Sequence, residues 1–409
     1  MGFADFYFER FKIYNNYFPE DPVSHDLKLI VIIPSYREFR LYDTLECLSR
    51  NNPSFQTEVI VMFNAPQGED RHVLEMHRHQ AKNISRFDRE KIKFLPVIEE
   101  NVSERLAGAG MARKLAMDIA LSRFNRINYP DGIIVSLDAD TLCEPNYLQA
   151  IYEEFKRRPK ASGASIAYEH PIQGDEFPQE VYDAIILYEL YLRYYIQALR
   201  YIHFPYAFHT IGSAMAVRAW AYAKAGGMGV QKAGEDFYFL HKVMQLGGFF
   251  EIKSTKVYPS PRISNRVVFG TGPAIRQIIS KREYDYPTYP LESFLQLKPI
   301  FVCVEDLYTE DWQDLPLSEE LQEFLKANFF AQALEKMRKN SSKPETFAKR
   351  FWQWFDAFRI LKFLNFLLQE KGYEKAPVTQ ESRKLLKLIG KRAAFTAKDL
   401  LLAYRELQN

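Results

Sequence analysis

One apolar segment of this chain ends in two acidic residues, and this arrangement limits both the fold and the chemistry. The apolar run 133–137 follows a Pro-Asp-Gly turn at 130–132 and leads directly into Asp138 and Asp140. A short apolar run bounded by turn residues is typical of a buried strand. The aspartates are therefore expected at the carboxyl end of a strand, where open α/β sheets bind ligands. Two hard oxygen donors suit Mg²⁺ or Mn²⁺, which usually bind few carboxylates together with substrate phosphates.

Strand-like and helix-like segments alternate before and after this motif. Apolar runs predict strands at 29–34, 59–63, 92–98, 165–168, 214–217 and 249–258, and intervening segments predict helices at 69–87, 105–124, 145–158, 179–202 and 235–246. Such alternation is typical of an α/β fold, with a parallel sheet that carries helices on both faces.

Composition shifts along the chain predict four parts. They are an N-terminal helical arm at 1–26, an α/β domain at 27–270, an irregular linker rich in Pro, Gly and Tyr at 271–314, and a helical C-terminal domain at 315–409. Within the last part we expect helices at 318–338, 344–371, 380–391 and 396–407. The spacing of Thr396 and Asp399 resembles a capping box at the start of the final helix.

Charge and cysteine content exclude several classes of protein. The 409 residues carry a formal net charge of +2, which argues against a general nucleic-acid coat. The three cysteines, Cys47, Cys143 and Cys303, are far apart, which argues against a disulfide framework or a zinc site. The N-terminal residues do not resemble a signal peptide, and no segment resembles a spanning helix. We therefore expect a cytoplasmic protein.

Three further motifs suit a phosphorylated substrate. Glu235 and Asp236 follow a glycine at a predicted helix start, where a carboxylate is stabilised as an anion and can act as a general base; a simple N-cap by Asp236 is the alternative. Arg262 and Arg266 precede a glycine-rich turn and can hold a diphosphate, or form a solvated basic turn. The segment 34–38 follows the first strand, at the edge where a nucleotide would bind.

Three motifs, in their order and at their separations along the chain, resemble family 2 glycosyltransferases of the GT-A fold: the segment 34–38 after the first strand, the Asp138–Asp140 motif, and the turn at 234–236. The resemblance covers about residues 27–270 and includes the glycine- and arginine-containing segment 108–114. It implies a Rossmann-like nucleotide-diphospho-sugar transferase domain that moves a sugar from a nucleotide diphosphate sugar to a hydroxyl acceptor, with inversion. The implied acceptor is a glycan, a lipid or a small molecule, and the implied cofactor is Mn²⁺ or Mg²⁺.

The resemblance also implies a role for individual residues. Asp236 is the expected catalytic base, with Glu235 beside it, and Asp138 and Asp140 are the expected metal ligands. The expected donor-binding residues are Pro34, Ser35, Tyr36, Glu38, Asn64, Arg113, Asp138, Arg262 and Arg266. Gly212 and Ser213 are expected on the acceptor side. Asn64 departs from the family, which usually has an aspartate near the nucleotide base at this position, and the Gln-x-x-Arg-Trp motif of processive synthases is not evident.

Two other functions stay open at the level of sequence. The string 137–142 also resembles the first motif of haloacid-dehalogenase phosphatases, in which the first aspartate is a nucleophile. That motif normally opens its domain, whereas three strand-like segments precede it here. The second alternative is a non-catalytic module that binds nucleotide sugars within a polysaccharide-assembly complex.

The tyrosine-rich helix predicted at 179–202 allows two interpretations. It contains tyrosines beside Arg193 and Arg200, a combination that suits peripheral contact with the inner face of a membrane and a lipid-linked acceptor. The other interpretation is a buried helix between domains or between the subunits of a homo-oligomer.

Overall fold

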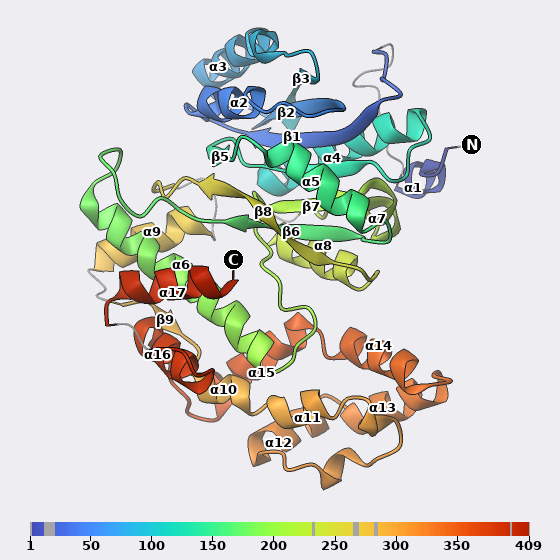
Figure 1. The fold of residues 1–409 in the computed structure, drawn as a ribbon, viewed down its shortest axis with the longest axis vertical. Helices are drawn as coiled ribbons and strands as arrows, with labels where there is room; N and C mark the ends of the chain where they lie inside the picture. The colour runs from blue at the N-terminus through green and yellow to red at the C-terminus, as the bar shows by residue number, and fades with distance from the viewer. Residues whose placement is uncertain are drawn as a thin grey trace. The chain divides into compact units, whose positions relative to one another are not determined.

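The computed structural model describes residues 2–11, 21–230, 234–264, 270–281, 285–392 and 395–408. These residues form two compact units (Figure 1). The first unit consists of residues up to 182 together with 208–277, and the second unit consists of 183–207 and 278–408.

The first unit is built on a mixed sheet of eight described strands, in the order β3-β2-β1-β4-β7-β6-β8-β5. The strands are β1 (Leu27–Ser35), β2 (Gln56–Pro66), β3 (Ile92–Val102), β4 (Ile133–Ser136), β5 (Thr141–Cys143), β6 (Gly163–Tyr168), β7 (Met215–Arg218) and β8 (Phe250–Pro259). β3, β2, β1 and β4 run parallel, whereas β7 is antiparallel to both β4 and β6. The residues 29–33 of β1 are fully buried, as expected for a central parallel strand.

Helices cover this sheet and follow the predicted alternation. They are α1 (Asp5–Phe11), α2 (Leu41–Ser49), α3 (Arg71–Lys82), α4 (Ala109–Arg126), α5 (Tyr147–Arg157), α7 (Ala219–Lys224) and α8 (Glu235–Met244), with a 3₁₀ turn at Ile84–Phe87. α4 packs along β1 and β2, and its fully buried Ala112, Ala116 and Ala120 allow this close approach. The N-terminal helix α1 packs on α4, because Tyr7 donates a 2.7 Å hydrogen bond to Asp118.

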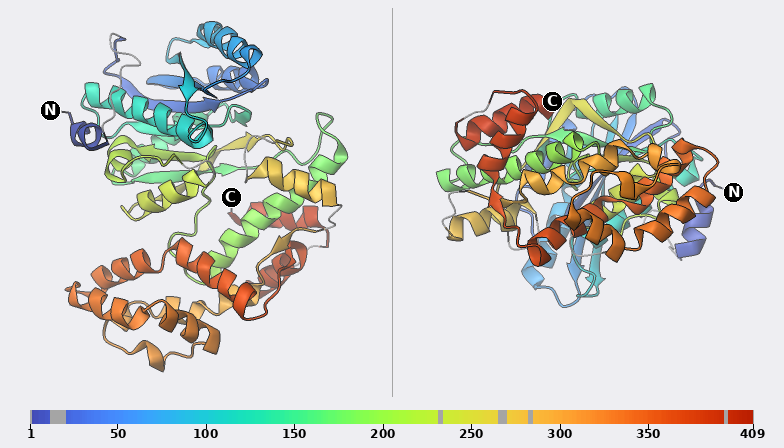
Figure 2. Two further views of the ribbon diagram at one scale, coloured as in Figure 1. Left: turned by 180° about the vertical axis from the view of Figure 1, so that it is seen from behind. Right: turned by 90° about the horizontal axis from the view of Figure 1, so that it is seen from below.

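The second unit is helical, which confirms the predicted class of the C-terminal region (orange to red in Figures 1 and 2). Its helices are α10 (Leu291–Leu295), α11 (Lys298–Val302), α12 (Glu319–Ala327), α13 (Phe330–Lys339), α14 (Pro344–Trp354), α15 (Ala357–Glu370), α16 (Val378–Leu388) and α17 (Ala397–Gln408), with 3₁₀ turns at Asp306–Tyr308 and Trp312–Asp314. Two short strands, β9 (Pro287–Thr288) and β10 (Ala376–Pro377), pair antiparallel. α6 (Gln179–Tyr201) and α9 (Thr271–Lys281) have residues in both units.

Two of the expected C-terminal helices are each broken into two. The segment 318–338 is interrupted at Phe329, whose φ of 55° is left-handed and ends α12 before α13 begins. The segment 344–371 is interrupted before Asp356, whose side chain accepts from the Arg359 N–H at 2.9 Å and starts α15. The cap expected at Thr396 is present, because Thr396 Oγ1 accepts from the Asp399 N–H at 3.1 Å.

The expectation of an irregular linker at 271–314 is wrong for much of that segment. α9, α10 and α11 lie within it, and its residues from 278 onward belong to the second unit. The prolines are the reason for the error, since Pro290 directly precedes α10 and Pro299 lies in the first turn of α11. Proline is favourable at the first positions of a helix and does not by itself indicate irregular structure.

Two tyrosines of α6 contact other residues of the second unit. Tyr194 donates to the Tyr289 carbonyl at 2.9 Å, and Tyr191 contacts the ring of Tyr286. Arg193 is also buried and donates to Glu189 at 2.7 Å. Among the helices of the described residues, none combines the length and the apolar character that crossing a membrane requires.

Candidate active site

The predicted acidic motif lies at the point where the strand order of the sheet reverses. β1 lies between β2 and β4 in the sheet. The connection after β1 leads to β2 on one side of β1, and the connection after β3 leads to β4 on the other side. Such a switch point leaves a crevice beyond the carboxyl ends of the strands, where open α/β sheets bind ligands. Glu38 follows β1 and Asp140 follows β4, so the fold brings the first and central motifs together.

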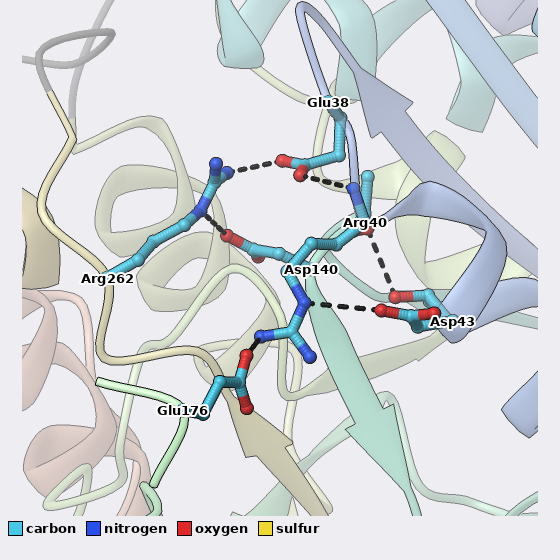
Figure 3. Close-up of polar contacts among 8 residues, drawn as sticks. Glu38, Arg40, Asp43, Asp140, Glu176 and Arg262 are labelled. Carbon is cyan, nitrogen blue, oxygen red and sulfur yellow. Dashed lines mark hydrogen bonds and ion pairs between the residues drawn. The ribbon is translucent and has the colours of Figure 1, made fainter.

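Arg262 joins these two motifs through its guanidinium group (Figure 3). Its Nε donates to Asp140 Oδ2 at 2.6 Å, and its Nη2 donates to Glu38. Arg262 follows β8, so a third element reaches the crevice. The structure thus places Glu38, Asp140 and Arg262 in one cluster, whereas Arg266 lies outside the described residues.

Negative charge is concentrated around Asp140. Burial raises its pKa to about 6, and nearby Asp138 and Glu38 add to the rise although Arg262 opposes it. Burial also raises the pKa of Glu38, against the effect of Arg262. A cation at this position is therefore electrostatically favourable, and in the structure the Arg262 guanidinium supplies one.

Arg113 forms a second link, between Asp138 and Glu235. Its Nη2 donates to Asp138 Oδ1 at 2.6 Å, and its Nη1 donates to Glu235. The Arg113 side chain is only 7% exposed, yet the attraction of Asp138 and Glu235 outweighs burial and raises its pKa. The acidic turn after β4 and the start of α8 are therefore connected through one buried arginine of α4.

Gly212 makes room for this arginine. A Cβ atom at Gly212 would lie 2.6 Å from both Cζ and Nη2 of Arg113, closer than carbon side-chain atoms pack. Any larger residue at this position would displace the guanidinium. The structure therefore places Gly212 against Arg113, and Ser213 next to it is buried.

Glu235 and Asp236 have different environments at the start of α8. Glu235 is buried and paired with Arg113, whereas Asp236 is half-buried. Burial raises the pKa of Asp236 to about 6, with Arg113 opposing the rise and Glu235 adding to it. Asp236 Oδ1 accepts a hydrogen bond from the Phe237 N–H at 2.8 Å, and Asp236 Oδ2 does not take part in that hydrogen bond. A carboxylate with this pKa suits a general base near neutral pH.

The residues expected around the nucleotide lie at the same edge of the sheet. Pro34 and Ser35 end β1, and Ser35 Oγ is buried with no hydrogen-bond partner among the described residues. The hydroxyl of Tyr36 donates to Glu69. Asn64 donates through Nδ2 to the Gly108 carbonyl at 3.1 Å, so its amide holds the loop before α4.

Sequence reasoning missed several residues that organise this edge. Arg40 forms ion pairs with Asp43 and Glu176 (Figure 3). Thr44 Oγ1 donates to the Ala139 carbonyl at 3.1 Å and so fixes the backbone between the two aspartates. The contacts of Thr44 with Ala139 and of Arg40 with Glu176 join residues that are 95 or more positions apart in the sequence. No local sequence pattern indicates such contacts.

The donor set suits a hard divalent cation that takes further ligands from its substrate. Asp138 and Asp140 offer carboxylate oxygens, and their side chains are 34% and 18% exposed. Within the described residues no group of three or more His, Cys, Asp or Glu side chains is placed to hold a metal. Mg²⁺ is commonly bound through one or two carboxylates plus phosphate oxygens, so two aspartates at a crevice fit this mode.

Comparison with known proteins gives one family match. Residues 133–280 match the model described as "Glycosyl transferase family group 2". A search of curated proteins found no match. The matched segment contains β4, both aspartates of the acidic motif, Gly212, and the start of α8 with Glu235 and Asp236.

Solved structures with some similarity include three crystal structures of TarS from S. aureus. TarS 1-349 is 14% identical at a TM-score of 0.38, and its complex with UDP-GlcNAc is 15% identical at 0.38; each match covers 93% of this chain and 90% of that chain. A further TarS structure is 13% identical at a TM-score of 0.35, covering 83% of this chain and 55% of that chain. These values are too low to carry a structural or functional argument. The match of residues 133–280 to the glycosyl transferase family group 2 model supports a glycosyltransferase.

Proposed function

We propose that this glycosyltransferase moves a sugar from a nucleoside diphosphate sugar to a hydroxyl acceptor, with inversion at the anomeric carbon. The observation that carries the proposal is the connection through Arg113 between Asp138, on the donor side, and the Glu235-Asp236 turn, on the acceptor side. A single displacement needs both groups to face one sugar at the same time.

On the donor side, Asp138 and Asp140 would hold Mg²⁺ or Mn²⁺. Such an ion would offset the negative charge that develops on the nucleoside diphosphate as it leaves. Arg262 would bind the same leaving group once it exchanges Asp140 for a phosphate oxygen. A pair of unit charges 4 Å apart is worth about 4 kcal/mol at an effective dielectric constant near 20, which indicates how strongly one guanidinium can contribute.

On the acceptor side, Asp236 would act as the base and Glu235 would hold Arg113. The oxygen of the acceptor hydroxyl forms a bond to the anomeric carbon, the bond from that carbon to the diphosphate oxygen breaks, and the hydroxyl proton passes to Asp236. Glu235 is less suited to this step because its carboxylate is buried against Arg113. The half-buried Asp236 has the exposure that proton transfer from an acceptor requires.

The phosphatase alternative needs Asp138 as a nucleophile. The Arg113 guanidinium, 2.6 Å from Asp138, already engages one oxygen of that carboxylate, and the family match favours sugar transfer. The binding-module alternative uses the same crevice without turnover. Turnover itself separates these functions.

The test measures release of nucleoside diphosphate from a panel of nucleotide sugars, with Mn²⁺, Mg²⁺ or EDTA, and with simple hydroxyl acceptors or water. We expect one donor to turn over with a divalent cation, and Asp140→Asn and Asp236→Asn to remove that turnover. Release of inorganic phosphate from phosphomonoesters by the same preparation would favour the phosphatase. Donor binding without turnover under every condition would favour the module.

A further inference from the structure

Two cysteines that are far apart in the sequence lie side by side in the first unit. Cys47 is on α2 and Cys143 is on β5, 96 positions later, and their Sγ atoms are 3.6 Å apart. Both thiols are free. The distribution of cysteines in the sequence gives no sign of this pair, because only the packing of α2 against β5 brings the two residues together.

The surroundings of the pair make the two sulfur atoms unequal. The Cys47 thiol can donate to the Cys143 carbonyl at 3.0 Å, and either thiol can donate to the other. When Cys47 is ionised, the Cys143 backbone N–H, 3.2 Å from Cys47 Sγ, and the Cys143 thiol both serve as donors to that sulfur. These donors stabilise negative charge on Cys47, so its pKa is lowered to about 7, mainly by the hydrogen bond from the Cys143 thiol. The pKa of Cys143 is raised in turn by the same hydrogen bond and by burial.

Accessibility follows the same division. Cys47 is partly exposed, whereas Cys143 is 6% exposed. A thiolate that is accessible, next to a second thiol that is protected, is the arrangement of a reactive cysteine with a resolving partner.

We infer that Cys47 and Cys143 form a redox modification site, in which a peroxide converts the two thiols into a reversible disulfide. The Cys47 thiolate attacks one oxygen of hydrogen peroxide, the O–O bond breaks, and a sulfenic acid and hydroxide form. The Cys143 sulfur then attacks the Cys47 sulfur, the S–O bond breaks, and the departing hydroxide leaves as water with the Cys143 proton. Two thiols are oxidised to one disulfide while one peroxide is reduced to two waters.

The geometry requires only a small movement for this bond. The two sulfur atoms must approach from 3.6 Å to about 2.0 Å, and rotation about the side-chain bonds can supply part of this movement. The bond would join α2 to the strand that follows the acidic motif, since Cys143 lies three residues after Asp140. α2 already contacts that turn through Thr44 and Ala139.

The experiment uses the full chain with Cys303→Ser, which removes the one other thiol and keeps the proposed pair. The reduced protein is titrated with hydrogen peroxide, and free thiols are counted after denaturation together with the intact mass. We expect both thiols to disappear together, with a mass loss of two hydrogens per chain, a cross-linked Cys47–Cys143 peptide, and full recovery with dithiothreitol. Stepwise oxygen addition to Cys47 while Cys143 stays reduced would overturn the inference, as would disulfides only between chains.

Two variants test the assignment of roles. In the Cys143→Ala chain we expect Cys47 to stop at the sulfenic acid, which dimedone traps, and in the Cys47→Ser chain we expect Cys143 to resist the same peroxide dose. Dimedone labelling of Cys143 in place of Cys47 would reverse the roles and contradict the mechanism. Because the titration with both cysteines intact needs neither variant, a folding defect in either one does not affect the main result.

Discussion

Arg113 Nη2 lies 2.6 Å from Asp138 Oδ1, and the other terminal nitrogen of the same guanidinium binds Glu235. One side chain of α4 thus holds carboxylates that follow β4 and begin α8, elements almost a hundred residues apart. The positions of the expected cation ligand and of the expected base therefore depend on each other through Arg113. This dependence can be measured in stability as well as in activity.

Removing Arg113 is expected to destabilise the first unit. In Arg113→Ala, the buried Glu235 and the neighbouring Asp138 lose their common countercharge, and breaking a buried ion pair by removing one partner typically costs about 3–5 kcal/mol. Arg113→Lys keeps the charge but loses the two-armed geometry, so it should be intermediate in stability and poor in activity. Urea denaturation and donor turnover measure the two effects. Equal stability of Arg113→Ala and the wild type would show that the bridge is not important for folding.

Gly212→Ala is expected to impair the site by displacing Arg113. The added Cβ would be 2.6 Å from Arg113 Cζ, so the guanidinium must move away from its carboxylates. We expect transfer to fall about 10- to 100-fold, on the reasoning that small misplacements of a catalytic arrangement are costly. The matched control is Gly212→Ala introduced into the Arg113→Ala variant. The clash with the guanidinium is absent there, so the additional loss of transfer activity should be small. An equal loss in both backgrounds would contradict the proposed cause.

The sequence was informative where the signal is local. The strands expected at 29–34, 59–63 and 92–98 are confirmed as β1, β2 and β3, because central parallel strands are continuous apolar runs. The break at Phe329 could not be predicted in the same way. Its left-handed backbone occurs at a residue type that does not favour it, inside a segment that was expected to form one helix.

Contacts between distant segments were the part that the sequence could not supply. Asp140 and Glu38 could be placed at strand ends, but nothing local indicates that Arg262 joins them. The meaning of Gly212 was also hidden, since a glycine in a loop does not reveal which side chain occupies the space beside it. The pairing of Cys47 with Cys143 depends in the same way on the packing of α2 against β5.

Arg262→Ala is expected to strengthen binding of Mn²⁺ in the absence of donor. The guanidinium compensates Asp140 and Glu38 in the structure, so a divalent cation must compete with it for Asp140. The same variant should slow transfer by about 10²–10³-fold, because a group that stabilises the leaving diphosphate is lost. Titration of free Mn²⁺ by electron paramagnetic resonance measures the first effect. Arg40→Ala is the control, since Arg40 pairs with Asp43 and Glu176 and not with Asp140; weaker Mn²⁺ binding in Arg262→Ala would contradict the prediction.

Transfer is expected to depend on pH through Asp236. A base must be deprotonated to act, and the pKa of Asp236 is raised to about 6, so the rate should fall as the pH drops through about 6. Asp140 also has a raised pKa, but a saturating divalent cation keeps a liganding carboxylate ionised. The profile of kcat at saturating cation and donor therefore reports Asp236. Asp236→Asn should lose about 10²–10⁴-fold of the rate and retain donor affinity; a flat acidic limb in the wild type would rule out Asp236 as the base.

The same raised pKa predicts that Asp236 reduces stability at neutral pH. Its pKa is about 6 in the folded chain and 3.8 for the free group, so between these values the folded state binds more protons than the unfolded state. The free energy of unfolding then decreases as the pH rises through this window and stays lower above it. A shift of two pKa units corresponds to about 3 kcal/mol, which sets the upper limit of the effect on the free energy of unfolding.

Asp236→Asn should therefore raise the melting temperature near pH 7.5 and lose this advantage near pH 4, when Asp236 of the wild type is protonated. Thermal denaturation at both pH values measures the difference. Destabilisation of Asp236→Asn at neutral pH would contradict this prediction. It would show that the interactions of the ionised carboxylate with Arg113 and the Phe237 N–H stabilise the fold by more than the burial of its charge destabilises it.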